Sequence, residues 1–327
     1  MKLLRRQFLN LAVGAAALSI KLSTSSAQTY PSRPVRMIVP FAPGGQVDTI
    51  ARLVAQILSK HFDKQFYVEN ASGAGGNIGM GRAAQAMPNG HTILVVEGTS
   101  FVVNPTLYDK VPYDPYRDFD PITIVARSTQ VLTVNLTLLV RTVQDLIDLV
   151  KANPGKYSYS SPGVGTAGHL TGELFRMSLG LDLVHVPFPG AGPAVAATIA
   201  GHTNMAFGSA ASTVGHIHES KLRALAVASG KRLQALPDVP TMAEGGYPHI
   251  EANQWVGLLA PAGTPKEIVA AIYREVERGI VLAEIRERLA ALGFEPIAST
   301  PEEMAKLITL EAEIWGKVIR SAKIKAG

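Results

Sequence analysis

Four short segments combine glycine with small or hydroxyl-bearing residues and contain no lysine or arginine: residues 40–48, 72–79, 161–168 and 187–193. Glycine lets the main chain approach a ligand closely. Each segment precedes a predicted helix, whose N-terminus offers free N–H groups and the positive end of the helix dipole. One such loop would be an ordinary strand-to-helix turn. Four in one chain favour a cleft that binds a carboxylate through main-chain N–H groups.

Motifs for other chemistries are incomplete. Residues 73–79 follow a predicted strand as a dinucleotide-binding loop would, but Ile78 stands where that motif needs its third glycine. His216 and His218 lie two residues apart with no third ligand close in sequence, which disfavours a metal site. The sequence also lacks a P-loop motif and a Gly-x-Ser-x-Gly nucleophile motif. We therefore expect no cofactor and no metal.

Two further side chains each have two interpretations. His169 stands just inside the helix predicted after Thr166, and is either a catalytic group or, as we favour, a residue with a polar cleft or packing role. Trp255 either stacks on a ligand or, the favoured interpretation, anchors the packing where a strand crosses between domains. Cysteine is absent, which excludes disulfides, thiolate metal sites and a cysteine nucleophile.

Alternating strands and helices must position these loops. Apolar residues recur at helical spacing from Val47 to Leu58, and Thr142, Thr264 and Thr300 are predicted helix N-caps. This alternation predicts mostly parallel sheets flanked by helices, in which ligands bind beyond the carboxyl ends of the strands. Strands are predicted at residues 35–41, 66–69, 92–96, 156–160, 183–187, 204–207 and 222–228.

Residues 1–27 have the pattern of an export signal. Arg5 and Arg6 precede an apolar stretch over residues 8–20, and small residues end at Ala27, where we predict cleavage. The arginine pair is similar to the twin-arginine motif, and the alternative is a general secretory signal. The leader holds four of the 31 basic residues and none of the 26 acidic ones, so the rest of the chain is nearly neutral. We expect an exported, periplasmic protein that does not bind nucleic acid.

Seven motifs stand in order along the mature chain: residues 39–45 followed by Asp48, then 73–79, 103–108, 160–170, 221–227, 236–241 and 260–265. Together they resemble the periplasmic solute-binding proteins of tripartite tricarboxylate transporters, also called the Bug family. The resemblance covers the whole mature chain. It implies a two-domain periplasmic-binding-protein (Venus-flytrap) fold, and a carboxylate held in the cleft through main-chain amides and waters.

The resemblance also implies how the chain divides. Residues 28–127 plus 254–327 would form the first, discontinuous domain, and residues 128–253 the second. The chain would cross between them near residues 126–130 and 252–255. The first two glycine loops would then face the other two across the cleft.

The loop chemistry and the resemblance together give a set of candidate ligand-binding residues. They lie in three of the glycine loops and in segments that follow two further predicted strands. The set is Phe41, Gly44, Gly45, Asp48, Thr99, Ser100, Ser161, Gly163, Gly165, Thr166, Gly190 and Ser209.

Two positions depart from the family pattern and bear on which solute fits. Ser209 stands where relatives often have an aspartate, and Glu97 where a small or hydroxyl residue is expected. A carboxylate at Glu97 repels a carboxylate ligand. The side chain either turns away to bond main-chain donors, leaving a simple acid as the ligand, or pairs with an amino or amide group of the ligand. We favour the first.

The sequence thus predicts a monomeric extracytoplasmic receptor, not an enzyme. It would capture a small carboxylate solute and deliver it to the permease subunits of a tripartite tricarboxylate transporter. One alternative is a ligand sensor for a signalling partner. Another is a hydrolase or isomerase on the same fold, which the missing acid–base pair disfavours.

Overall fold

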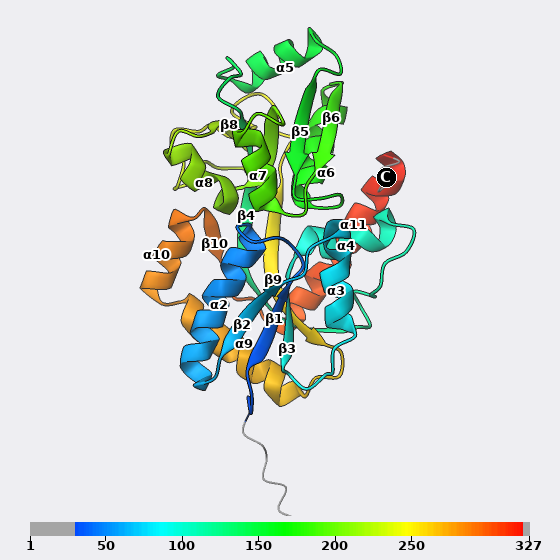
Figure 1. Ribbon diagram of the computed structural model, residues 1–327, viewed down its shortest axis with the longest axis vertical. Helices are drawn as coiled ribbons and strands as arrows, with labels where there is room; N and C mark the ends of the chain where they lie inside the picture. The colour runs from blue at the N-terminus through cyan, green and yellow to red at the C-terminus, as the bar shows by residue number, and fades with distance from the viewer. Residues whose placement is uncertain (1–29, 323–327) are drawn as a thin grey trace, which may run out of the picture.

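The computed structural model describes residues 30–322, which form two α/β lobes connected through β4 (Phe119–Val134) and β9 (Asn253–Pro261) (Figure 1). The predicted export signal lies outside the described residues. The first lobe contains β1 (Val35–Val39), α2 (Gln46–Phe62), β2 (Phe66–Asn70), η1 (Ala74–Gly76), α3 (Asn77–Ala84), β3 (Thr92–Glu97), α4 (Gly98–Leu107), α9 (Lys266–Ile280), α10 (Ala283–Ala291), β10 (Phe294–Pro296) and α11 (Pro301–Ala322). The second contains α5 (Val143–Lys151), β5 (Tyr157–Ser161), α6 (Ala167–Ser178), β6 (Leu183–Pro187), α7 (Ala191–Ile199), β7 (Met205–Ser209), α8 (Ala210–His218) and β8 (Arg223–Val227).

The strands form two sheets that share β4. Their orders are β2-β1-β3-β9-β4-β10 in the first lobe and β8-β4-β7-β5-β6 in the second. β1 pairs in parallel with β2 and β3, and β5 with β6 and β7, as the strand–helix alternation predicts. The pairings of β4 and β9 are antiparallel. The expectation of mostly parallel sheets therefore fails at these two strands, because they join the lobes without the crossover helix that parallel pairing requires.

β4 passes from one sheet into the other. It pairs with β9 as far as Thr129, which lies opposite Asn253, and with β7 from Gln130, which lies opposite Ser209. The Ala252 N–H, just before β9, donates to Ala228 O at 2.8 Å in the second lobe. The chain therefore crosses between the lobes at two neighbouring points.

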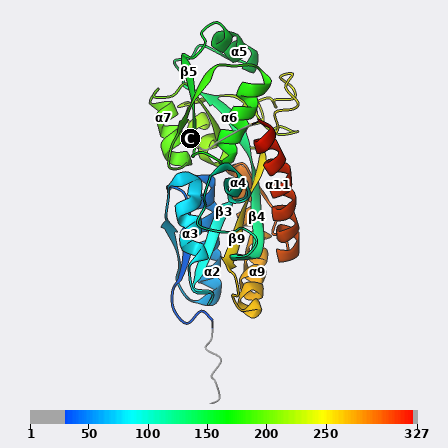
Figure 2. The ribbon, with the colours of Figure 1, turned by 90° about the vertical axis from the view of Figure 1, so that its right-hand side faces the viewer.

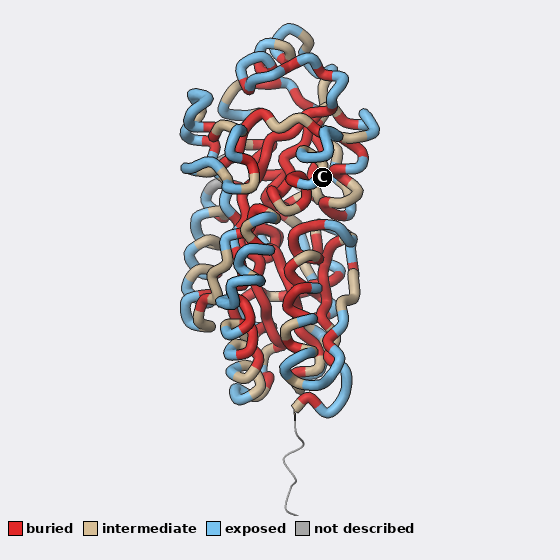
Figure 3. The backbone as a smooth tube through the Cα atoms, turned by 90° about the vertical axis from the view of Figure 1, so that its left-hand side faces the viewer, coloured by how far each residue is buried: buried red, intermediate tan, exposed pale blue. Residues whose placement is uncertain are grey.

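The apolar faces of the helices pack against the sheets and form the core of both lobes. Figure 3 shows that the buried segments lie in the interior of each lobe. α2 shows how the sequence produces this packing. Val47, Ile50, Val54 and Leu58 recur at helical spacing, and all four are buried in the first lobe's core. The predicted helical face is therefore the buried one.

The predicted helix N-caps have different outcomes. Thr142 and Asp145 form the reciprocal capping box that starts α5, and the Thr300 hydroxyl accepts the Glu303 N–H at 3.2 Å at the start of α11. Both predictions are confirmed. The prediction for Thr264 is wrong, because its hydroxyl donates to Pro261 O at 2.6 Å and α9 begins after Pro265 with no side-chain cap.

The C-terminal helix α11 lies along the first lobe, against α4 and β4 (Figure 2). Met304 and Ile308 of this helix are buried in the same cluster as Phe101 and Trp255. None of the helices in the described part of the chain is both long and apolar enough to cross a membrane.

Candidate ligand-binding cleft

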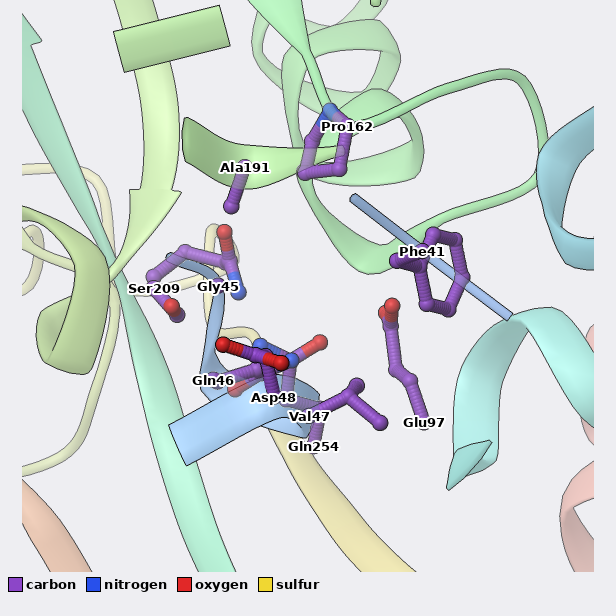
Figure 4. A pocket seen from close by; sticks show the side chains of 12 residues that line it. Phe41, Gly45, Gln46, Val47, Asp48, Glu97, Pro162, Ala191, Ser209 and Gln254 are labelled. Atoms are coloured by element: carbon purple, nitrogen blue, oxygen red, sulfur yellow. The ribbon is translucent and has the colours of Figure 1, made fainter. Parts of the chain in front are cut away.

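A narrow cavity lies between the two lobes (Figure 4). The volume that the centre of a water molecule can reach is about 20 Å³, little more than one water needs. The lobes are therefore closed around this space. The first lobe and its strand β9 contribute Phe41, Gly45, Gln46, Val47, Asp48, Glu97 and Gln254 to the lining, and the second lobe with β4 contributes Gln130, Pro162, Gly168, Ala191 and Ser209.

Direct contacts join the lobes beside the cavity. The Ala42 N–H donates to Pro189 O at 3.1 Å, and the Tyr108 hydroxyl donates to Val164 O at 3.2 Å. Gly44 faces Gly192 so closely that a Cβ built on Gly44 would lie 3.6 Å from the Gly192 Cα. The glycine loops thus allow the two main chains to approach each other.

Helix N-termini converge on the cavity from both lobes. α2 begins at Gln46 and α7 at Ala191, and their N-caps, Gly45 and Gly190, provide no side-chain hydrogen bond. The first N–H groups of these helices therefore have no partner within the helix. Among the described residues, no lysine or arginine lines the cavity. The arrangement can bind an anion through main-chain N–H groups and helix dipoles.

Four of the twelve predicted binding residues line the cavity: Phe41, Gly45, Asp48 and Ser209. Asp48 is nevertheless engaged by the protein. Burial by itself would raise its pKa, but hydrogen bonds from Arg52, Asn70 and the Gly44 N–H outweigh that effect and lower the pKa. The Asp48 carboxylate therefore holds its own loop.

The other eight predicted residues do not line the cavity: Gly44, Thr99, Ser100, Ser161, Gly163, Gly165, Thr166 and Gly190. Three of their four hydroxyls, those of Ser100, Ser161 and Thr166, form hydrogen bonds within the protein. The Ser161 hydroxyl bonds to His185 Nε2 at 2.7 Å, and Ser100 donates to Glu97 O at 3.2 Å. The glycines sit where one lobe touches the other, as Gly163 does against Gly75.

Sequence reasoning left out three of the six polar side chains that line the cavity, Gln46, Gln130 and Gln254. Gln46 and Gln254 are 6 % and 3 % exposed, and each has a buried amide oxygen with no hydrogen-bond partner. Gln130 lies on β4 at the point where that strand changes sheets. Gln46 lies within the first glycine loop, residues 40–48, and could have been included, whereas Gln130 and Gln254 carry no local signal.

Glu97 is a deeply buried acidic residue in the lining of the cavity. It ends β3 and is 3 % exposed, and its Oε1 accepts the Ala167 N–H at 2.7 Å, at the first residue of α6 in the opposite lobe. Burial raises the pKa of the Glu97 carboxyl to about 7, although this hydrogen bond acts in the opposite direction. The side chain does bond a main-chain donor, as the favoured interpretation expects, but it does so inside the cavity.

Comparison with known proteins identifies the family. The model of the "Tripartite tricarboxylate transporter family receptor" matches residues 50–324. The chain belongs to this family. The Bordetella pertussis protein BugT is a relative of this receptor, with 35 % identity over 92 % of this chain and 93 % of BugT.

Solved structures share the receptor's fold. R. palustris Rpa4515, solved with adipate, matches with a TM-score of 0.88 and 32 % identity, over 90 % of this chain and 99 % of that one. MatC from Rhodopseudomonas palustris, solved with bound malate, matches with a TM-score of 0.84 and 31 % identity, over 89 % and 100 % of the two chains. The predicted family and two-domain flytrap fold are confirmed. Family membership also confirms that the chain is a solute receptor and not an enzyme.

His169 and Trp255 have structural roles in this receptor. His169 Nδ1 accepts the Gly165 N–H at 3.2 Å, and its ring stacks on His185 with centroids 4.3 Å apart. Trp255 is 1 % exposed, lies in the first lobe's core and donates to Glu311 at 2.9 Å. Neither side chain lines the cavity. The favoured interpretation is therefore confirmed for Trp255, and of the two roles favoured for His169 the structure shows packing and not a place in the cleft.

Thr166→Val is expected to lower the receptor's free energy of unfolding by about 1 kcal/mol. The Thr166 hydroxyl donates to Gly163 O at 2.7 Å and accepts the His169 N–H at 3.4 Å, so valine removes the N-cap of α6. Solute affinity should fall by less than about fivefold, because the hydroxyl does not line the cavity. Urea unfolding and calorimetric titration measure the two effects, with the exposed Thr309→Val as control. A stable variant that has lost binding would instead place the hydroxyl on the solute.

Proposed function

We propose that this receptor captures a small carboxylate solute in the cavity between its lobes and delivers it to the permease of a tripartite tricarboxylate transporter. One observation supports the proposal above all. The N-termini of α2 and α7 converge on the cavity, and among the described residues no basic side chain lines it. Main-chain N–H groups at helix ends are suited to a carboxylate, whereas a cation would be repelled by the same dipoles.

The related structures solved with adipate and malate support a carboxylate as the solute class. The leader at residues 1–27 supports export to the periplasm, with cleavage after Ala27 and a twin-arginine route. We further assign the protein as a monomer, with residues 28–127 plus 254–327 as one domain and residues 128–253 as the other. The change of partners along β4 at Thr129 and Gln130 falls close to this boundary.

Solute uptake requires the lobes to separate and then close again, because the cavity is too narrow to admit a carboxylate as it stands. We expect the hinge at the two crossings, Gln130 and Ala252, because the strands on either side are hydrogen-bonded within the sheet of their own lobe. Hinge closure around a ligand is a known mode of domain movement.

Native mass spectrometry of receptor purified without refolding, followed by calorimetric titration, tests the proposed function. We expect a co-purified carboxylate that rebinds at one site per chain and remains unchanged on long incubation. The titration series pairs organic acids with neutral sugars of similar size. Saturable binding of a sugar or a bare cation, with no binding of any acid, would show the proposal to be wrong.

A further inference from the structure

Glu97 places a carboxyl group where the solute must sit. Its carboxyl extends into the cavity beneath Phe41 and Pro162 (Figure 4). The other carboxylate in the lining, Asp48, has Arg52 as its ion-pair partner at 2.9 Å. For Glu97, the described residues include no basic partner within ion-pair distance. The cavity therefore carries one uncompensated carboxyl group.

Glu97 also occupies one of the positions that a solute carboxylate would use. The Ala167 N–H at the start of α6 already bonds to Glu97 Oε1 at 2.7 Å. The N-termini of α2 and α7 have no such occupant among the described side chains. A dicarboxylate would therefore meet a like charge at one end of the cavity, whereas a single carboxylate can use the two open helix ends.

Two neutral side chains also present acceptor atoms in this cavity. The buried amide oxygens of Gln46 and Gln254 have no hydrogen-bond partner, and both residues line the space beside Glu97. Buried acceptors of this kind need a donor, because leaving them without one costs free energy. A ligand group that carries several N–H donors and a positive charge would satisfy Glu97 and these amides together.

We propose that the solute carries a protonated amine as well as a carboxylate, and that Glu97 binds the ammonium group. This inference rests on the proposed function and narrows it to amine-bearing carboxylates, such as amino acids. The carboxylate bonds to the open N-termini of α2 and α7, and the ammonium group lies among Glu97, Gln46 and Gln254. Glu97 thereby selects against acids that lack the amine, because those leave two negative charges close together.

Titration calorimetry on wild type and Glu97→Gln, with acids that differ only by the amine, tests the assignment. The pairs are alanine and propionate, glutamate and glutarate, and 4-aminobutyrate and butyrate. We expect wild type to prefer the amine-bearing member of at least one pair by tenfold or more. Glu97→Gln should weaken binding of that member by roughly 10- to 150-fold, the range for a charged hydrogen bond, and leave the plain acid unchanged or tighter.

Glutamine keeps an oxygen that can accept the Ala167 N–H, so the variant should retain the wild-type melting temperature. Glu219→Gln, at an exposed site away from the cavity, is the matched control. Plain acids that bind wild type as tightly as their amine-bearing partners would overturn the inference and leave the proposed function intact. Failure of every acid, together with an identified neutral or cationic solute, would overturn both.

The pH dependence of solute affinity gives a second test of whether Glu97 binds an ammonium group. Burial in the closed cavity raises the pKa of the Glu97 carboxyl to about 7. A solute carboxylate beside it raises that pKa further, so a plain acid takes up a proton at Glu97 when it binds. Proton uptake on binding means that plain-acid affinity rises as pH falls from 7.5 to 5.5. An ammonium group keeps Glu97 ionised, so the affinity of an amine-bearing solute should change less than about threefold over this range.

The neighbouring charged groups do not produce this difference. On α2, Asp48 has a lowered pKa and stays paired with Arg52. On α6, burial lowers the pKa of His169 to about 4, so that ring stays neutral over this pH range. An amine-bearing solute whose affinity rises tenfold on acidification in wild type but not in Glu97→Gln would overturn the inference.

Discussion

Gly192→Ala is expected to lower solute affinity roughly 100-fold or more without weakening the fold. Gly192 lies in the first turn of α7, and a Cβ there would lie 2.5 Å from the Pro43 carbonyl oxygen in the opposite lobe. The carbonyl belongs to the main chain and the methyl group is bonded directly to the Cα, so neither can move aside as the end of a flexible side chain would. The methyl group therefore obstructs the closed state, while the open state has room for it.

Within its own lobe the same substitution should be neutral or favourable. Alanine is a better helix residue than glycine by about 0.5–1 kcal/mol, so the melting temperature should stay level or rise. Calorimetry measures the affinity, and small-angle scattering should show that solute no longer reduces the radius of gyration. Gly215→Ala in α8, where a Cβ meets no atom within 4 Å, is the matched control. Wild-type affinity in Gly192→Ala would mean that binding does not need this degree of closure.

The parts of the fold that sequence predicts are those with local signals. The strand and helix of a βαβ unit are neighbours in sequence, so each has a local pattern. The strand predicted at residues 183–187, for example, matches β6 at both ends. β4 is different. Its 16 residues pair with residues of β7, β8, β9 and β10 that follow their partners by roughly 70 to 170 positions. Pairing over such separations leaves no periodic pattern inside β4 from which its full length can be inferred.

The site shows the same division between local and non-local information. The glycine loops are predicted correctly as the segments that meet across the cleft, because glycine itself permits the close approach. Which side chains line the cavity depends on the direction in which each side chain points. Glu97 lines the cavity, whereas Thr99 and Ser100 shortly after it are buried without lining it. Residue type alone does not determine which of these neighbouring side chains faces the cavity.

The junction between β3 and α4 leads to the second large effect. Gly98→Ala is expected to lower the free energy of unfolding by about 3 kcal/mol, at the upper end of the usual cost of overpacking. A Cβ on Gly98 would overlap the indole ring of Trp255. The ring cannot yield easily, because Trp255 is 1 % exposed and its Nε1–H donates to Glu311 Oε2 at 2.9 Å. Urea unfolding measures the loss, with Gly230→Ala as a control at a site where a Cβ meets no atom closer than 3.9 Å.

A double-mutant cycle with Trp255→Leu identifies the cause of this loss. The leucine variant should itself be destabilised by several kcal/mol, because it loses a buried indole and the hydrogen bond to Glu311. In that background the smaller side chain leaves room for the Gly98 methyl group, so Gly98→Ala should cost less than about 1 kcal/mol. Equal costs in the two backgrounds would mean that the methyl group clashes with something other than the indole. A coupling of roughly 2 kcal/mol would show that the Trp255 indole is what excludes a side chain at position 98, directly beside the cavity-lining Glu97.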